Sequence, residues 1–165
     1  CGLYFFVAIL FAKKMRNKRY MPLVRALTEC AQSFERCSGA HVRTLGLTPA
    51  QFDIIATLGN TDGMSCKELG ERTLITKGTM TGVLNRLEQK GLLIRHESPD
   101  DGRSWITKLT RNGQGLFEDI FPRHLAHLDP LFASFTDTEL NSMQLHLNRL
   151  RLAFEPLTSV GRETR

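Results

Sequence analysis

The sequence of 165 residues contains few cysteines, no long hydrophobic run and none of the residue sets that enzymes use. Its four cysteines form no C-x-x-C pair and are not densely spaced, so they indicate neither a disulfide framework nor a zinc finger, and we expect a chain of the reducing cytoplasm. The longest apolar run, LYFFVAILFA, is too short to span a bilayer, so we expect no membrane partner. No nucleophile with its base, no glycine-rich phosphate loop and no cluster of metal ligands is visible, so we expect no enzyme, no cofactor and no metal site.

Residues 1–21 are interpreted as an N-terminal extension. Its apolar run precedes the basic stretch KKMRNKR, whereas a secretory signal carries its basic residues first. We expect either a helix that packs on a partner subunit or sequence upstream of the natural start.

The rest of the chain is long enough for one globular domain with a core of its own. There are 22 Lys and Arg residues against 17 Asp and Glu, which gives a net charge of +5 and an isoelectric point near 9.3. This mildly basic balance suits a nucleic-acid partner, although an ordinary basic surface with no partner explains it equally well.

Segment 22–47 is predicted to form a long helix. Residues at spacings of three and four share one of its faces, namely Leu23, Leu27, Cys30, Phe34, Cys37 and His41. The next helix begins with Thr48 as its N-cap and Pro49 at its first position. A short third helix is capped by Ser65, and Glu68 completes its capping box.

The fourth helix, which Thr76 caps and Gly91 ends, carries the strongest functional signal. Its predicted buried stripe consists of Met80, Val83, Leu84 and Leu87. The opposite face, flanked by Lys77, consists of Gly78, Thr81, Gly82 and Asn85. Two glycines inside a helix cost about 1 kcal/mol each relative to alanine, so we expect something to approach this face closely. A small, polar face without acidic groups fits a DNA major groove, and a loosely specified solvent face is the alternative.

Two short strands are predicted over residues 92–97 and 104–110, joined by the hairpin SPDDGRSW. The Pro-Asp-Asp-Gly chemistry explains the turn but does not explain Arg103 at its tip. A hairpin that directly follows a major-groove helix is a wing, and Arg103 can enter the narrow minor groove of A·T-rich DNA. Asp101 can orient its guanidinium group. Arg95 and Lys108 are expected near the backbone phosphates.

The segments LTPAQFDIIATL, SCKELGERTLITKGTMTGVLNRLEQKGLLIR and PDDGRSWITKLTRNGQGLF resemble the multiple antibiotic resistance regulator (MarR) family of transcription regulators. The resemblance extends over residues 22–154 and is most specific in the L-E-x-x-G-L end of the fourth helix and the Asp-x-Arg wing. It implies a mainly α fold with a small β-hairpin wing, in which residues 48–110 form a winged helix-turn-helix domain. Segments 22–47 and 111–165 then form a helical dimerisation lobe.

The same resemblance implies a homodimer that binds a pseudo-palindromic operator in double-stranded DNA. The DNA-binding residues that it implies, together with those expected above, are Ser65, Thr76, Lys77, Gly78, Thr79, Thr81, Asn85, Arg86, Arg95, Asp101 and Arg103. Three positions depart from the family pattern, because many relatives carry Asp at Asn85, Leu at Thr73 and Arg at Gly102. The first weakens any carboxylate–arginine bridge from the fourth helix, and the last leaves the wing more dependent on Arg103.

The C-terminal part is predicted to contain one helix from residue 110 that Pro130 ends, and a last helix that opens with a capping box of Thr136 and Glu139. The last helix carries a narrow apolar seam of Leu140, Met143, Leu147, Leu150 and Phe154. By periodicity alone this seam could pack inside the chain. The family resemblance implies instead that it pairs across a dimer axis, together with the first helix and its Leu23 and Leu27.

The resemblance also implies a repressor that a small aromatic or phenolic anion releases by binding between the two lobes. The residues expected to contact it are Phe34, Cys37, His41, Arg43 and Phe52. Two other sensing classes stay open: oxidation of Cys30, Cys37 or Cys66, and a metal held by His124 and His127 with Cys30 or His41. A winged helix used only for protein interaction is a remote alternative, since its exposed face would be acidic or apolar.

Overall fold

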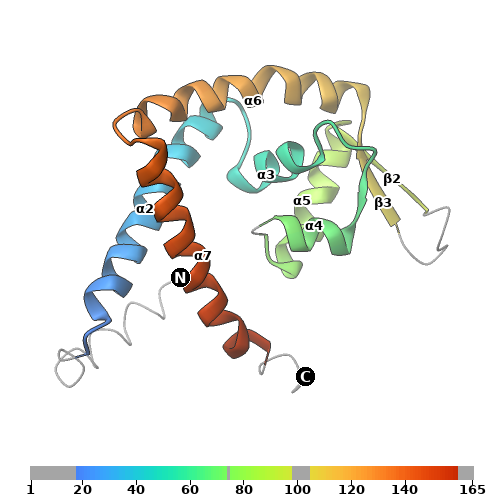
Figure 1. Ribbon diagram of the computed structural model, residues 1–165. Coiled ribbons are helices and arrows are strands. Elements are labelled where there is room, and N and C mark those ends of the chain that lie inside the picture. The colour runs from blue at the N-terminus through green and yellow to red at the C-terminus, as the bar shows by residue number, and fades with distance from the viewer. Residues whose placement is uncertain (1–17, 74, 98–104, 160–165) are drawn as a thin grey trace. The chain divides into compact units, whose positions relative to one another are not determined.

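The computed structural model describes residues 18–73, 75–97 and 105–159, and Figure 1 shows them as ribbons. They are mainly helical with one small antiparallel sheet, as the sequence predicts. Most of residues 1–21, which we interpret as an extension, lie outside the described part. The chain divides into two compact units inside one long helix, the first ending at His124 and the second beginning at Leu125. The predicted domain limits at residues 47 and 110 stay predictions.

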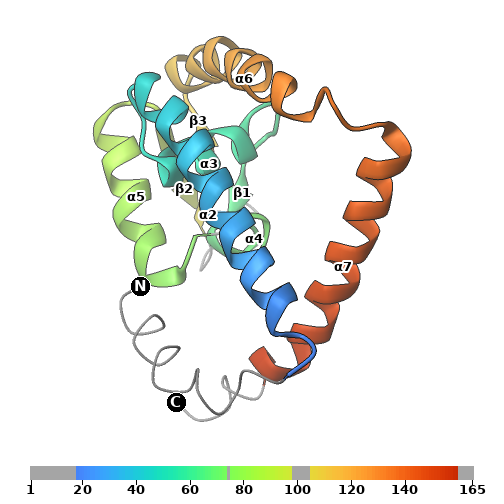
Figure 2. The same cartoon turned by 90° about the vertical axis from the view of Figure 1, so that its left-hand side faces the viewer.

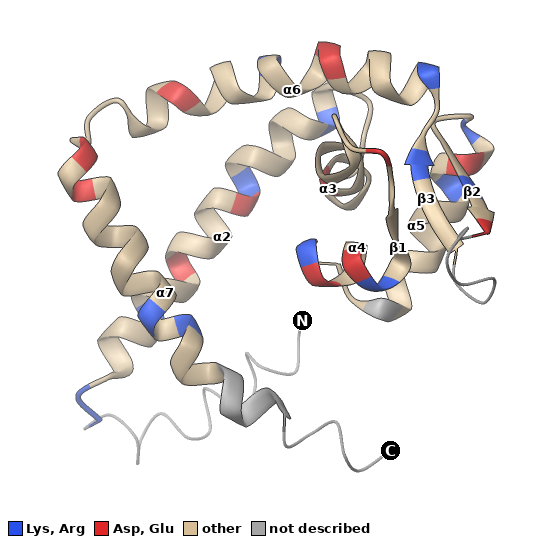
Figure 3. Ribbon diagram, turned by 45° about the vertical axis from the view of Figure 1, so that its right-hand side comes forward, with Lys and Arg blue, Asp and Glu red and all other residues tan. Residues whose placement is uncertain are grey.

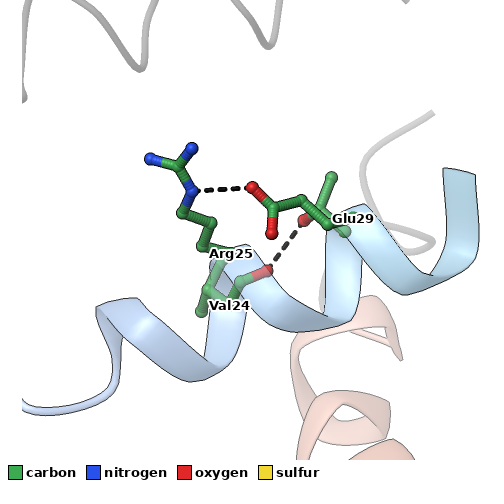
Figure 4. A network of polar contacts seen from close by, with 4 residues as sticks. Val24, Arg25 and Glu29 are labelled. Carbon is green, nitrogen blue, oxygen red and sulfur yellow. Dashed lines mark hydrogen bonds and ion pairs between the residues drawn. The ribbon is translucent and has the colours of Figure 1, made fainter.

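The first described helix, α2, spans Met21–Thr44 and has Pro22 in its first turn, where its missing N–H costs no helical hydrogen bond. The first half of α2 is largely exposed to solvent in the single chain and is stabilised by local contacts. Arg25 Nε donates to Glu29 Oε1 at 2.7 Å, and Thr28 Oγ1 donates to the carbonyl of Val24 at 2.8 Å (Figure 4). Exposed pairs of this spacing stabilise a helix by about 0.3–0.5 kcal/mol. The packing of α2 into the core therefore depends on its second half, where Val42 is buried.

Helix α3 spans Pro49–Leu58 and is central to the first unit, where it contacts α2, α4, α5 and β3 (Figure 2). Thr48 is its N-cap, as predicted, and Gln51 completes a capping box that the sequence analysis did not anticipate. The side chains of Ile54, Ile55 and Leu58 are almost completely buried. A hydrophobic helix in this position fixes the surfaces on which the other elements pack.

The sheet has three strands, β1 (Met64–Ser65), β2 (Leu93–Glu97) and β3 (Trp105–Leu109), in the order β1-β3-β2. The hairpin of β2 and β3 was predicted, and its register places Leu93 opposite Leu109. The two-residue strand β1 was missed, because a segment this short carries no alternation of apolar and polar residues. It pairs Met64 with Thr107.

Helix α4 spans Cys66–Arg72 and helix α5 spans Lys77–Gln89. The predicted stripe of α5 is buried, with Met80 and Val83 at 5% exposure, Leu84 at 1% and Leu87 at 0%. Gly91 follows the end of the helix with φ of +67°, the left-handed conformation that commonly terminates a helix. One prediction needs correction: Thr76 is the N-cap residue of α5, but its side chain makes no capping hydrogen bond.

Helix α6 spans Arg111–Phe132 and helix α7 spans Asp137–Ser159. The prediction that Pro130 ends α6 is wrong, since the helix continues through it to Phe132. A proline lacks one backbone donor, and this loss alone does not end a helix when the proline lies in its last turn. The capping box of α7 is confirmed, with Thr136 N–H donating to Glu139 Oε2 at 2.8 Å and Glu139 N–H donating to Thr136 Oγ1 at 3.3 Å. Among the described residues, none of the helices is both long and apolar enough to cross a membrane.

Candidate nucleic-acid interface and ligand cavity

Helix α5 presents the predicted small, polar face to solvent. Gly78, Thr81, Gly82 and Asn85 are all exposed. A Cβ atom added to Gly78 or Gly82 would meet no other atom within 4 Å, so packing within the described chain does not require glycine at either position. Since glycine costs about 1 kcal/mol inside a helix, these exposed glycines fit the prediction that a partner outside the chain approaches this face, which stays a prediction.

An arginine from β2 is held against α5. Arg95 Nη2 donates to Asn85 Oδ1 at 2.9 Å and forms a short ion pair with Glu88. The hydrogen bond from Arg95 lowers the pKa of the Glu88 carboxyl, and the same bond raises the pKa of the Arg95 guanidinium. The prediction that Arg95 meets backbone phosphates did not anticipate these two partners, which keep its guanidinium on the protein.

Other predicted DNA contacts also have partners inside the chain. The Ser65 hydroxyl is engaged in the capping box of α4, where Glu68 N–H donates to Ser65 Oγ at 3.2 Å. The backbone N–H of Ser65 donates to Glu68 and lowers the pKa of that carboxyl. At the start of α5 the hydroxyls of Thr76 and Thr79 lie 3.1 Å apart. A hydroxyl has donor and acceptor sites to spare, so these contacts do not prevent it from meeting a phosphate as well.

The outer part of the predicted interface is only partly described. Arg86 is exposed on α5, and Lys108 on β3 lies 3.5 Å from Asp62. Figure 3 shows basic segments on both β2 and β3. The predicted contacts Asp101 and Arg103 at the wing tip lie outside the described residues, and so does the side chain of Lys77.

The first unit contains a cavity of about 680 Å³ between α2, α3 and the start of α5. Three of the five residues predicted to contact a ligand line it, namely Phe34, Arg43 and Phe52. Cys37 and His41 are not among the lining residues. The lining residues that were not predicted include Glu35, Ser38, Asp53, Thr76, Thr79 and His124. Ser38 follows Phe34 by four residues on the same helix face, which is the signal that could have identified it, whereas Glu35 directly follows Phe34 and carries no such signal.

His124 on α6 is the buried polar group of this cavity, and its exposed fraction is 5%. Its Nδ1 lies 2.9 Å from Nδ1 of His41, and its Nε2 lies 3.2 Å from Ser38 Oγ. The ring of Phe52 meets the His124 ring edge-on, with centroids 4.7 Å apart. His41 therefore reaches the cavity through His124 rather than directly, and the pair links α2 to α6.

The alternative sensors were also located. Cys30 and Cys66 are exposed and Cys37 is half-buried, so none of these three thiols belongs to the buried core. Nowhere in the described ranges do three or more His, Cys, Asp or Glu side chains come together as a metal site would require.

Comparison with known proteins gives a consistent result. A family model described as MarR family matches residues 45–104. The HTH-type transcriptional regulator MhqR of Bacillus subtilis is 30% identical over 136 residues, which make up 82% of this chain and 94% of MhqR. Among solved structures, a MarR mutant from E. coli complexed with operator DNA matches with a TM-score of 0.71 at 24% identity, covering 86% of this chain and 97% of its own. NadR in complex with 4-hydroxyphenylacetate matches with a TM-score of 0.69 at 22% identity, and the match covers 81% of this chain and 95% of the NadR chain.

Proposed function

The chain belongs to the MarR family of winged helix-turn-helix transcription regulators, and from this premise we propose that it is a dimeric repressor that a small phenol or aromatic carboxylate releases from its operator. The observation that carries the proposal is the cavity in the first unit. It lies directly behind the start of α5, the helix whose exposed face is suited to the major groove. A regulator that binds an operator must have access to the chromosome, so we infer that the protein acts in the bacterial cytoplasm.

The cavity suits a small aromatic molecule. Its volume lies within the range of about 300–1,000 Å³ that is typical of ligand sites. The rings of Phe34 and Phe52 offer apolar faces, and the Arg43 guanidinium offers donors for a phenolic or carboxylate oxygen. Glu35 and Asp53 also line the cavity, and their carboxylates disfavour a ligand with more than one negative charge.

A ligand in this cavity reaches the DNA-binding helix without any long relay. Thr76 and Thr79 line the cavity and stand at the N-terminal end of α5, where both are also predicted DNA contacts. A ligand that binds better to one position of this helix end than to another shifts the equilibrium between DNA-binding and released states. The free energy of this shift equals the difference between the ligand's binding free energies for the two states.

A dimer supplies the two reading helices that a pseudo-palindromic operator requires. In the single chain several predicted interface residues are exposed, including Leu23 at 53%, Leu147 at 55% and Phe154 at 47%, and Leu27, Leu140 and Leu150 are half-buried. Apolar side chains exposed at helical spacing along a seam are typical of a helix that pairs with another chain. Two copies would contact half-sites about 10 base pairs apart, one turn of the duplex.

Two relatives support the two halves of the proposal. The matched MarR structure is complexed with operator DNA, and the matched NadR structure holds 4-hydroxyphenylacetate. These are properties of those proteins and supply the probes for this one.

The test is release of a bound operator. An operator is first selected from a random duplex pool, and binding is followed by fluorescence anisotropy while salicylate or 4-hydroxyphenylacetate is added. We expect release, and we expect Arg43→Met to raise the half-maximal concentration about tenfold, because it removes a charge-assisted hydrogen bond of about 1.5–3 kcal/mol. Arg36→Met, which alters an exposed arginine of α2 outside the cavity, is the matched control.

Oxidation of a thiol is the competing switch, because Cys30 and Cys66 are exposed. Release by peroxide that disappears in a variant without Cys30, Cys37 and Cys66, together with no response to either aromatic compound, would assign the switch to the thiols instead.

A further inference from the structure

One side chain on the DNA-facing surface of α5 has its orientation fixed by the protein. Asn85 is exposed, and its Oδ1 accepts a hydrogen bond of 2.9 Å from Arg95 Nη2. The donor cannot easily move away, because the same nitrogen of Arg95 is paired with Glu88. The Arg95 side chain is about one quarter exposed, so its pairing is less weakened by water than that of a surface ion pair.

The fixed oxygen determines what the amide can offer to a partner. The oxygen and nitrogen of a side-chain amide diverge from one carbon, and only the nitrogen carries hydrogens to donate. With Oδ1 turned toward Arg95 on β2, Nδ2 is turned away from it. A freely rotating asparagine would present either group, whereas this one is held in a single orientation.

The surroundings leave room for a base edge. Gly82 precedes Asn85 by one helical turn, and a Cβ at Gly82 would have no neighbour within 4 Å. The open space at Gly82 therefore lies on the same exposed face as Asn85, beside the amide group that Arg95 orients.

We propose that Asn85 reads DNA by donating from Nδ2 to an acceptor on a base edge in the major groove, and that Arg95, anchored by Glu88, is the positioning residue for this contact. The proposal rests on the proposed function as an operator-binding regulator and names how one of its residues selects sequence. Guanine N7 and O6, adenine N7 and thymine O4 are such acceptors, whereas the amino group of cytosine would set a donor against a donor. Asn85 therefore disfavours a cytosine amino group at the base that it faces.

The test compares base preferences rather than affinities alone. Wild-type protein and variants are each used to select duplexes from a random pool, and the preference at every operator position is read by sequencing. Asn85→Ala identifies the position that Asn85 reads, where we expect the preference to fall about fivefold to tenfold, the effect of about one base contact. Arg95→Ala should broaden the preference at that same position, because the amide is then free to rotate.

Replacing the amide by a carboxylate separates a donated from an accepted contact. In Asn85→Asp the side chain can only accept, so a guanine or thymine preferred by the wild type should give way to its complement, cytosine or adenine, which carries an amino group. If a wild-type preference for guanine or thymine is kept in Asn85→Asp, the contact does not depend on donation from Nδ2 and the proposal is wrong. If the wild type prefers adenine, 7-deazaadenine in its place removes the N7 acceptor and should abolish the preference, and a preference that survives it overturns the proposal.

Three further variants control the result. Arg86→Ala removes an exposed cation of α5 and should weaken binding to all sequences without changing any base preference. Glu88→Gln keeps Arg95 but weakens the ion pair that anchors it. This variant should broaden the base preference at the same operator position to a smaller extent, and it preserves the test if Arg95→Ala folds poorly. Arg95→Lys should restore little of the preference, because one ammonium group does not reproduce the planar donor fork.

The outcomes distinguish the two proposals. A wild-type protein that selects no sequence at all overturns the proposed function, and the assignment of Asn85 with it. A wild-type protein that selects an operator whose base preferences are unchanged in Arg95→Ala and Glu88→Gln overturns only the role of Arg95.

Discussion

The hydroxyl of Thr107 offers a direct test of how the base of the wing is stabilised. Thr107 lies in β3, is fully buried, and its Oγ1 has no hydrogen-bond partner among the described residues. A buried hydroxyl without a partner costs about 1–3 kcal/mol. Valine has nearly the same shape and no polar atom, so Thr107→Val should raise the free energy of unfolding by about 1 kcal/mol. For a chain of this size that corresponds to an increase in Tm of about 2–4 °C.

The matched control is the other buried threonine of the same unit. Thr73 is 6% exposed, but its Oγ1 donates to the carbonyl of Leu69 at 2.6 Å. Thr73→Val removes this bond and should lower the free energy of unfolding by about 1 kcal/mol. Both variants are measured by urea unfolding followed by circular dichroism. Equal destabilisation by the two substitutions would refute the reasoning, because it would mean that the Thr107 hydroxyl is satisfied.

Three other predictions concern packing, assembly and pH. Gly113→Ala should destabilise the fold by at least about 2 kcal/mol in the same urea assay, since its Cβ would lie 1.9 Å from the carbonyl oxygen of Leu92; a stable variant would show that α6 can shift there. Leu147→Asp should dissociate the proposed dimer in sedimentation by burying an unpaired charge, whereas Leu145→Asp, outside the seam, should not; a monomeric wild type at micromolar concentration contradicts the dimer. The pKa of Glu139 is lowered from 4.5 by its capping hydrogen bonds, so its stabilisation is present above pH 4.5 and is lost as the pH falls through the lower folded value. Glu139→Gln should flatten the acid limb of the stability curve, and an unchanged limb would remove Glu139 as its source.

Local features of this chain could be predicted from its sequence. The capping boxes of α4 and α7, the buried stripe of α5 and the hairpin all follow from spacing over a few residues. The expectation that Phe34 and Phe52 contact a ligand came from the family resemblance and not from their spacing, and both residues line the cavity.

The features that were missed depend on residues far apart in the sequence. His41 and His124 are separated by 83 residues, and no local pattern indicates that their rings meet. The contact of Arg95 with Asn85 needs the exact placement of β2 beside α5. Strand β1 exists only because β3 pairs with it. Pro130 does not end α6, because the loss of one backbone donor is a local effect that the rest of the helix outweighs.

We expect the exposed face of α5 to bind duplex DNA. The decisive measurement is the affinity of Thr81→Glu for the selected operator, determined by fluorescence anisotropy beside the wild type and Asn112→Glu. Thr81 is exposed on α5 and Asn112 is exposed on α6, so both variants add the same charge without disturbing the core. We expect an affinity loss of at least about a hundredfold for Thr81→Glu, little change for Asn112→Glu, and a wild-type affinity that falls steeply with salt. Equal affinities of Thr81→Glu and the wild type would contradict this expectation.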